Sequence, residues 1–393
     1  MDAPGQGTDR PGPGTGGRDG GPVQELDLVT GAFGNTGRAI ARLLLGEGRR
    51  VRTLTNHPGP RGEAEAIEVR PYRFDDPDQL AASFTGVDTF YDTFWMRTGT
   101  TSGYEAVVER SRALIAAAER AGVRRIVHLS VAHASEASPF PYFRAKALVE
   151  SAVRASSVPA AIVRPALIFG GHAVLLNNLA WLLRRLPVFA VAGDGSYRVR
   201  PVHVDDVARL CIGLAEGRAP HAVTDAGAHG ADSAHGADGA DSGDGAVDAV
   251  GPERPTYLEL VTSVRDLVGG RARLVRLPAA LVLQGAKVLG SVLRDDVLTR
   301  DELVSTMEGL ADTEGPATGD IRLSDWLREN ASGLGQRYIN ERRQRRPRRP
   351  GRHPPRGGAH GTRGVRTAAR VARRPGTAPP WPPGARPTRA AGR

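Results

Sequence analysis

A tyrosine and a lysine stand four residues apart, at Tyr142 and Lys146, in a segment whose pattern predicts a helix. This spacing places both side chains on one face of the helix. A nearby ammonium group lowers the pKa of a phenol, so the tyrosine can exchange a proton with a carbonyl or hydroxyl group. Ser130, at the end of a predicted strand, is expected to polarise the reacting oxygen. The chain has 7 Tyr and only two Lys, so this pair is not expected by chance; the alternative is an aromatic–lysine contact that stabilises the helix.

The segment from Leu26 to Pro165 alternates between short apolar runs and stretches with helical spacing of apolar residues. This alternation predicts an α/β fold, a doubly wound parallel sheet of the Rossmann type. The predicted strands are Leu26–Thr30, Arg50–Thr55, Ala66–Phe74, Val87–Thr93, Arg125–Ser130 and Ala160–Arg164. The predicted helices of this part are Arg38–Leu45, Pro77–Phe84 with Asp76 as N-cap, Tyr104–Ala121 and Tyr142–Ala155.

Three glycines, Gly31, Gly34 and Gly37, follow the first strand and open the first helix. At such a junction the first glycine makes a tight turn, the second lets the backbone approach a pyrophosphate, and the third allows helix and strand to pack closely. The amino end of the helix supplies N–H groups and partial positive charge to the phosphates. The sequence therefore predicts a dinucleotide-binding loop, which Phe33, Asn35, Thr36 and Arg38 complete.

The residues after the second strand are Thr55, Asn56 and His57, without the acid that usually binds a free ribose 2′-hydroxyl. Arg38 and Arg61 can pair with a 2′-phosphate. The sequence therefore favours NADP(H), with NAD(H) as the alternative. We expect the adenine near Phe74 and Asp75 and the nicotinamide near Tyr91, Asp92 and Thr93, at the ends of the third and fourth strands.

Composition divides the 393 residues into four parts. We expect a disordered leader (1–22), a dinucleotide-binding domain (23–165), the rest of the sheet with a small C-terminal α/β substrate lobe (166–342), and a disordered tail (343–393). A flexible insertion is expected at 225–245. From Arg342 onward there are 16 Arg and no acid, whereas the remaining 37 basic residues are outnumbered by 43 acids, so the basic charge gives no reason to expect specific nucleic-acid binding.

Other features of the sequence narrow the class of protein. The single cysteine, Cys211, permits no disulfide within the chain, and no apolar run is long enough to span a bilayer. We therefore expect a cytoplasmic protein without a metal site. The sequence leaves the oligomeric state open.

Together, these motifs resemble those of the short-chain dehydrogenase/reductase superfamily. The resemblance is narrower to its atypical and extended members related to the nucleotide-binding accessory subunit of respiratory complex I and to NmrA-like proteins. It covers roughly residues 26–340 without the insertion. The matching stretches are Thr30–Gly37, Arg125–Ser130, Pro141–Ala147, Ile162–Gly170 and Arg200–Ala208, in the last of which Asp205 or Asp206 can also simply cap a helix.

This resemblance implies an NAD(P)-binding fold, reductase, epimerase or dehydratase chemistry, and a catalytic group of Ser130, Tyr142 and Lys146. Ser130 precedes Tyr142 by only 12 residues, a shorter gap than in many sugar epimerases of the extended type. Two hypotheses follow. The chain is either an NADP-dependent oxidoreductase acting on an unidentified carbonyl, alcohol or nucleotide-sugar-like substrate, or a non-catalytic dinucleotide-binding sensor or assembly factor.

Overall fold

The structure is a computed structural model that describes residues 25–56, 65–96, 101–171, 173–218 and 245–340. Several predictions fall elsewhere: the leader 1–22, the tail 343–393, all of the insertion 225–245 but its last residue, and the side chains of His57 and Arg61 lie outside the described residues. None of the described helices is long and apolar enough to cross a membrane.

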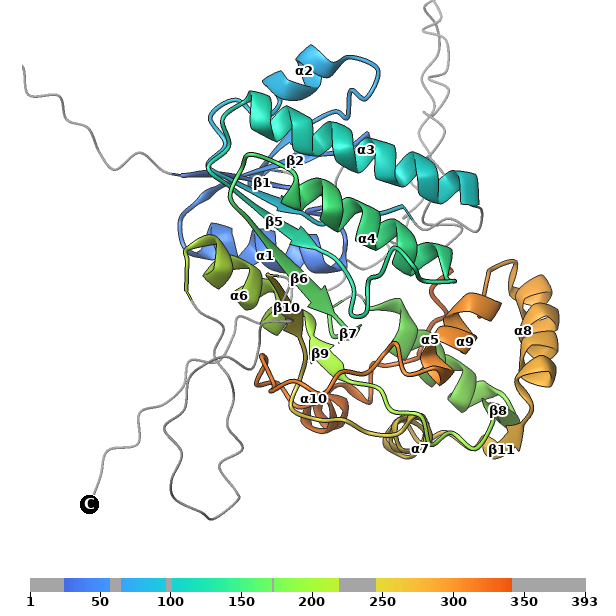
Figure 1. Cartoon of the computed structure of the whole chain (residues 1–393). Helices are drawn as coiled ribbons and strands as arrows, with labels where there is room; N and C mark the ends of the chain where they lie inside the picture. Colours follow the sequence, from blue (N-terminus) through green and yellow to red (C-terminus); the bar gives the residue numbers. More distant parts are fainter. Residues whose placement is uncertain (1–24, 57–64, 97–100, 172, 219–244, 341–393) are drawn as a thin grey trace, which may run out of the picture. The chain divides into compact units, whose positions relative to one another are not determined.

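A parallel sheet of seven strands forms the centre of the described chain, in the order β10-β6-β5-β4-β1-β2-β3 (Figure 1). Its strands are β1 (Leu26–Val29), β2 (Arg50–Leu54), β3 (Ile67–Arg70), β4 (Thr89–Asp92), β5 (Arg125–Leu129), β6 (Ala160–Pro165) and β10 (Ala246–Ala249). The chain order reverses between β1 and β4, and a crevice at such a point of a doubly wound sheet is where ligands bind. The predicted doubly wound Rossmann fold is confirmed.

Helices cover both faces of this sheet. On one face α1 (Asn35–Gly46) and α6 (Val204–Ala215) pack side by side over an apolar core that includes Ile40, Leu44 and Val207. On the other face α2 (Pro77–Ala82), α3 (Thr101–Arg120) and α4 (Pro141–Arg154) pack over a second core. The aliphatic strand residues alternate between these two cores, as a two-sided parallel sheet requires.

Beyond β6 the chain builds the predicted small α/β lobe and returns to the sheet at β10. Two short parallel pairs, β7 (Leu167–Phe169) with β9 (Pro201–His203) and β8 (Val188–Ala192) with β11 (Arg273–Leu277), lie outside the main sheet. The lobe's helices are α5 (Val174–Arg185), α7 (Tyr257–Leu267), α8 (Ala279–Leu293), α9 (Arg300–Met307) and α10 (Leu323–Asn330). Apolar residues of α5, α7 and α10 form its core.

Two local predictions were wrong. The third strand ends at Arg70 rather than Phe74, and Pro71, which has no N–H to donate, follows directly. Neither Asp205 nor Asp206 caps α6: the cap is His203, whose ring Nδ1 accepts a hydrogen bond from the Asp205 N–H over 3.2 Å. Asp206 instead accepts from the backbone N–H of Ile321 over 3.0 Å and so ties α6 to the C-terminal segment.

A buried ion pair fixes α4 to the sheet. Arg164 on β6 donates from Nε and Nη2 to the two carboxylate oxygens of Glu150 on α4, over 2.9 and 2.6 Å. Burial opposes ionisation of Glu150, but Arg164 and the Ser130 hydroxyl outweigh it and lower the pKa of the carboxyl. Arg154 adds a weaker contact to the same carboxylate from the helix surface, at 3.2 Å.

We therefore expect Arg164→Met to lower the free energy of unfolding by about 3–5 kcal/mol, because it leaves the Glu150 carboxylate buried without its main partner. Arg154→Met is the matched control: it removes a half-exposed partner of the same carboxylate, and we expect a loss of at most about 1 kcal/mol. Urea unfolding of the two variants measures the difference. Equal losses would show that Arg164 contributes no more than a surface charge.

Candidate active site

The phosphate loop joins β1 to α1 at the carboxyl edge of the sheet. Gly31 has a φ of 66°, in the left-handed region that favours glycine, and its carbonyl accepts a hydrogen bond from the Gly34 N–H over 2.7 Å. A Cβ at Gly37 would lie 2.3 Å from the Gly31 carbonyl oxygen, so only glycine permits this turn. Gly31 and Gly34 are exposed, and Gly37 is buried.

The amino end of α1 opens on this loop. Its first turn contains Asn35, Thr36 and Gly37, carries no acidic residue, and receives no hydrogen bond from a capping side chain. Free N–H groups and the helix dipole at such an end attract phosphate. The loop and helix therefore fit a dinucleotide pyrophosphate, and the residues that would hold it are those predicted from the glycine spacing.

Arg38 stays on the same loop, where its Nη2 donates to the carbonyl of Phe33 over 3.4 Å. At the end of β2, the side-chain oxygen of Asn56 accepts from the Tyr72 N–H over 2.9 Å, so the position that often holds an acid carries a neutral amide engaged with the next strand. The phosphate loop thus carries one cation, Arg38. Of the residues that follow β2, the two that the structure describes, Thr55 and Asn56, carry no carboxylate.

An aromatic group stands where the adenine was expected. Phe74 stacks on Tyr72 with ring centroids 5.1 Å apart, leans on Phe94 at 5.8 Å, and lies under the Arg110 guanidinium. Asp75, beside Phe74, is exposed in the turn before α2. An exposed carboxylate next to half-buried rings suits a purine with an exocyclic amine.

The expectation that the nicotinamide lies near Tyr91, Asp92 and Thr93 stays a prediction, and the Tyr91 side chain itself enters the core. Tyr91 is fully buried in the core between the sheet and the α1–α6 layer, and burial raises the pKa of its phenol. Only its backbone reaches the ligand edge, where the carbonyl accepts from the Thr30 N–H over 3.1 Å. Because side chains alternate along a strand, the next residue, Asp92, points to the opposite face.

Tyr142 and Lys146 lie together on α4, and both contact Trp95. The Lys146 ammonium stands 4.3 Å from the centre of the Trp95 ring, and the Tyr142 ring meets the same indole edge-on at 5.2 Å. Lys146 Nζ also donates to the Leu129 carbonyl at the end of β5 over 2.7 Å. Burial lowers the pKa of Lys146 to about 8, against the opposing charges of Asp92 and Glu150.

Trp95, which sequence reasoning missed, follows β4 directly and belongs to no regular element, so no periodicity marked it. Sequence reasoning also missed the contact between Asp92 and His128. The Asp92 carboxylate lies 2.8 Å from His128 Nδ1, and both side chains are buried. The only sequence signal was an acid at the end of an otherwise apolar strand. Asp92 supplies the negative charge that keeps a buried Lys146 protonated near neutral pH.

Ser130 directly follows β5 and is 3% exposed. Its hydroxyl oxygen is buried and has no hydrogen-bond partner among the described residues, although it helps to lower the pKa of the nearby Glu150 carboxyl. The expectation that Ser130 holds the substrate oxygen stays a prediction.

Tyr142 packs against an apolar cluster. Val131, Phe140 and Phe143 form a small buried cluster, against which Tyr142 itself, Ala134, Val304 and Leu310 pack. Val304 belongs to α9, so the C-terminal lobe closes over the loop between β5 and α4. An apolar wall beside a phenol and an ammonium is a suitable setting for a substrate that carries hydrocarbon next to a carbonyl group.

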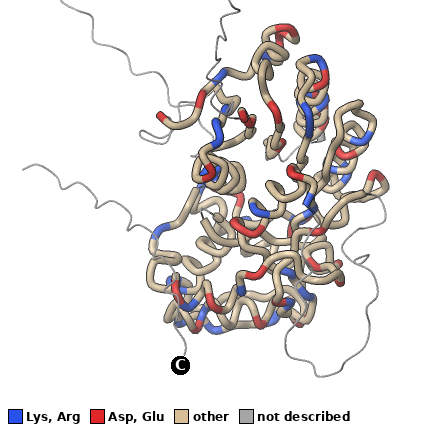
Figure 2. The backbone as a smooth tube through the Cα atoms, turned by 90° about the vertical axis from the view of Figure 1, so that its left-hand side faces the viewer, with Lys and Arg blue, Asp and Glu red and all other residues tan. Residues whose placement is uncertain are grey.

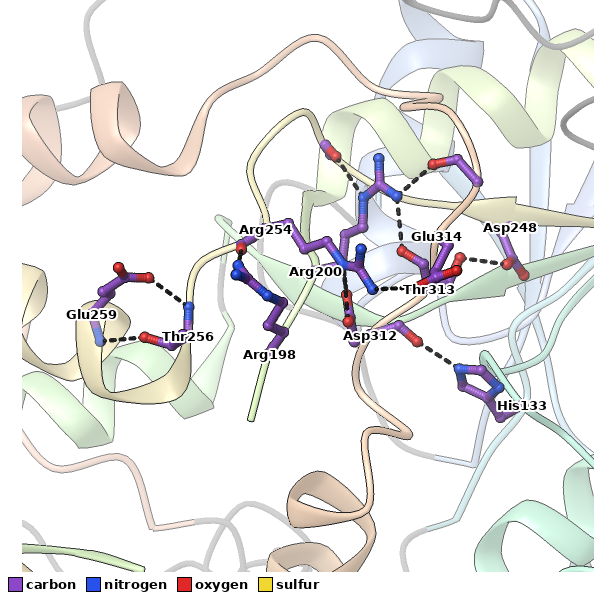
Figure 3. Close-up of polar contacts among 12 residues, drawn as sticks. His133, Arg198, Arg200, Asp248, Arg254, Thr256, Glu259, Asp312, Thr313 and Glu314 are labelled. Carbon is purple, nitrogen blue, oxygen red and sulfur yellow. Dashed lines mark hydrogen bonds and ion pairs between the residues drawn. The ribbon is translucent and has the colours of Figure 1, made fainter. Parts of the chain in front are cut away.

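A polar contact group holds this loop to the lobe (Figure 3). His133, whose φ of 58° is left-handed, contacts the Asp312 carbonyl through Nε2 at 2.5 Å. Arg254 pairs with the Asp312 carboxylate at 2.7 Å, and buried Arg200 donates to the Thr313 carbonyl over 2.8 Å. Three residues after Ser130, the chain is therefore fixed to the C-terminal segment.

A glycine loop at the reversal point of a doubly wound sheet is the arrangement in which dinucleotides bind. A family model described as NAD(P)H-binding matches residues 31–179. The chain is 29% identical to the ceramide reductase of Caulobacter vibrioides over 254 residues, which cover 64% of this chain and 73% of that protein.

It is also 33% identical to subunit 9 of the NADH dehydrogenase 1 alpha subcomplex of Arabidopsis thaliana, over 25% of this chain and 24% of that protein. Among solved structures, the triphenylmethane reductase of Citrobacter sp. complexed with NADP(H) shares the fold, with a TM-score of 0.58 and 16% identity, covering 78% of this chain and all of that one. The resemblance inferred from the sequence is confirmed: residues 31–179 form an NAD(P)-binding Rossmann domain with relatives among reductases and complex I accessory subunits.

The glycine loop generates a direct test. We expect Gly37→Ala to weaken NADPH binding by at least about tenfold, because the added Cβ must displace backbone atoms of Gly31 that face the pyrophosphate. Gly46→Ala, at the other end of the same helix, is the control, since a Cβ there meets nothing within 4 Å. Calorimetric titration of both variants with NADPH measures the effect, and unchanged affinity in Gly37→Ala would contradict the assignment of this loop to the pyrophosphate.

Proposed function

We propose that the chain is an NADP(H)-dependent reductase that interconverts a carbonyl group and an alcohol on a substrate with an alkyl chain. The observation that carries this proposal is the Tyr142–Lys146 pair, placed over one indole ring beside an apolar wall. The relative from Caulobacter vibrioides is named a ceramide reductase, and ceramide is a lipid with long alkyl chains. This supports a substrate that carries an alkyl chain. We further propose a division near Pro165, with cofactor residues before it and most of the substrate lobe after it.

In this mechanism Tyr142 donates the proton to the substrate oxygen. The glycine loop of Gly31, Gly34 and Gly37 would hold the dinucleotide, whose nicotinamide would supply the hydride. The Lys146 ammonium lowers the pKa of the nearby phenol and is itself kept charged by Asp92 and Glu150. Leu129 and Trp95 fix the position of that ammonium, one by a hydrogen bond and one by a cation–π contact. We propose that Ser130, whose buried hydroxyl has no hydrogen-bond partner among the described residues, holds the substrate oxygen.

The preference for NADP(H) over NAD(H) rests on charge. Arg38 stands on the phosphate loop, and a 2′-phosphate meets no carboxylate at Thr55 or Asn56. The solved structure with the same fold from Citrobacter holds NADP(H). Arg38 is thus the described cation best placed to distinguish the two cofactors.

We expect Arg38→Ala to weaken NADPH binding by roughly 10- to 150-fold and to leave NADH binding nearly unchanged. The loss of one charge-assisted contact, which contributes about 1.5–3 kcal/mol, corresponds to that range. Arg42→Ala is the matched control, because Arg42 lies one turn further along α1 and pairs with Asp205 at 2.7 Å. Titration of each variant with both cofactors gives the comparison. Equal losses for NADPH and NADH in Arg38→Ala would show that Arg38 does not contact the 2′-phosphate.

The reaction itself is tested with Tyr142→Phe, after a panel of alkyl ketones has identified a substrate by loss of the reduced-nicotinamide absorbance. Removing the proton donor should lower kcat by about 10²–10⁴-fold while NADPH affinity is retained. Wild-type turnover should also fall as the pH rises through about 8, where Lys146 loses its proton and the phenol becomes a weaker acid.

Two controls accompany this test. Tyr104→Phe removes a hydroxyl from the other tyrosine that faces Trp95, and Lys287→Met removes the second lysine of the chain; we expect normal turnover from both. If NADPH binds but no ketone is reduced, and Tyr142→Phe changes nothing, the reductase proposal is wrong. The chain is then a dinucleotide-binding sensor.

A further inference from the structure

Helix α8 exposes an apolar stripe along its length. Leu281, Gly285, Val288 and Val292 follow one another at intervals of four, three and four residues, which places them on one face of the helix. Leu281 is 50% exposed, Val288 68% and Val292 75%, and no residue of α8 is fully buried. We call these four residues the docking face.

The other apolar residues of α8 face the lobe, so the docking face points away from it. Among them, Val282, Leu283 and Leu289 are half-buried where the helix contacts β8 and α9. In Figure 1, α8 stands at the edge of the lobe beside α9, with the sheet on the far side of the lobe. Exposed aliphatic surface costs free energy in water, and contiguous stripes of it commonly mark interaction sites.

The charges on α8 and on the segment before it are basic. From Arg271 to Arg294 the sequence has five basic residues and no acid; Asp295 and Asp296 follow directly, of which Asp295 is buried and accepts a hydrogen bond from the Tyr338 hydroxyl over 2.9 Å. Figure 2 shows both signs interspersed over the rest of the described chain. Lys287 lies next to Val288 and is exposed, and Arg294 follows the last turn of the helix. Of the basic residues on β11, Arg276 faces Asp194, and Arg273 is exposed.

We propose that α8 docks parallel to the surface of an anionic lipid bilayer, with the docking face in the acyl boundary and the basic residues at the headgroups. An apolar stripe flanked by exposed cations is the pattern of interfacial helices. The 15 residues of α8 extend about 22 Å at 1.5 Å per residue, short of the roughly 30 Å hydrocarbon core, so the helix lies on the bilayer.

A second copy of the chain is a poorer occupant of this face. Pairing two docking faces would bring two Lys287 side chains and their neighbouring arginines together, with no acid between Arg271 and Arg294 to pair with them. The anionic bilayer supplies that missing charge. This inference stands on α8 alone and does not depend on the proposed reaction, although α9, which α8 contacts, carries Val304 beside the candidate active site.

The test uses the full-length protein with an environment-sensitive fluorophore attached to an introduced cysteine, Val288→Cys. The natural Cys211 is 1% exposed and does not compete for the label. We expect the emission to shift to the blue on addition of phosphatidylcholine vesicles that contain phosphatidylglycerol, and not with phosphatidylcholine alone. The control label is Val69→Cys, which replaces an exposed valine on β3 and should stay in water.

Adding Val292→Asp to the labelled protein should weaken the vesicle response at least about tenfold, and added salt should weaken it as well. Three results would overturn the proposal. The first is co-sedimentation with vesicles without a shift at position 288, which means that another segment binds them. The second is a shift that grows with protein concentration in the absence of vesicles, which means self-association. The third is no response at all.

Discussion

The packing of α4 against the sheet depends on two cations buried between them. Arg164 is matched by the Glu150 carboxylate in a two-point contact, and Lys146 by the Leu129 carbonyl, the Trp95 ring and the nearby charge of Asp92. A buried charge is tolerated only with such partners, so each contact fixes a distance between the helix and a particular strand. Tyr142 lies one turn before Lys146 on α4, so the same contacts also fix the position of Tyr142.

The same constraint has a chemical consequence. Burial lowers the pKa of Lys146 to about 8, which leaves the ammonium charged at neutral pH but weakly hydrated. A weakly hydrated cation acts more strongly on a neighbouring phenol than one in water does, because less solvent screens it. The contacts that orient α4 thus also place a charge near Tyr142, the proton donor of the proposed reaction, whereas the Glu150–Arg164 pair one turn further on only fixes the helix to the sheet.

The sequence predicted the elements far better than the contacts between them. Apolar periodicity and glycine spacing located the strands, the phosphate loop and the Tyr142–Lys146 pair, because each of these signals is local in the chain. Trp95 reaches Lys146 across 51 positions, from a residue outside any strand or helix, and no periodic pattern extends that far. The position of Tyr91 at a strand end did not show which way its side chain points, and the structure places it in the core, as alternate residues of a strand are. His203 was passed over as the α6 cap in favour of the acids that follow it, which are the more frequent capping residues.

The C-terminal lobe has two parts that differ in how firmly they are held. Segment 312–315 is bound by Arg200 and Arg254 and reaches back to His133 in the loop after β5, so the wall beside Tyr142 moves with the Rossmann domain. Helix α8 lies further out, with half-buried contacts to β8 and α9, and its carboxyl end is held by Asn340, whose Nδ2 donates to the Leu293 carbonyl over 2.9 Å. The cluster that contains Phe143 and Val304 therefore lies where the lobe is tied to the loop after β5, whereas α8 lies outside that cluster.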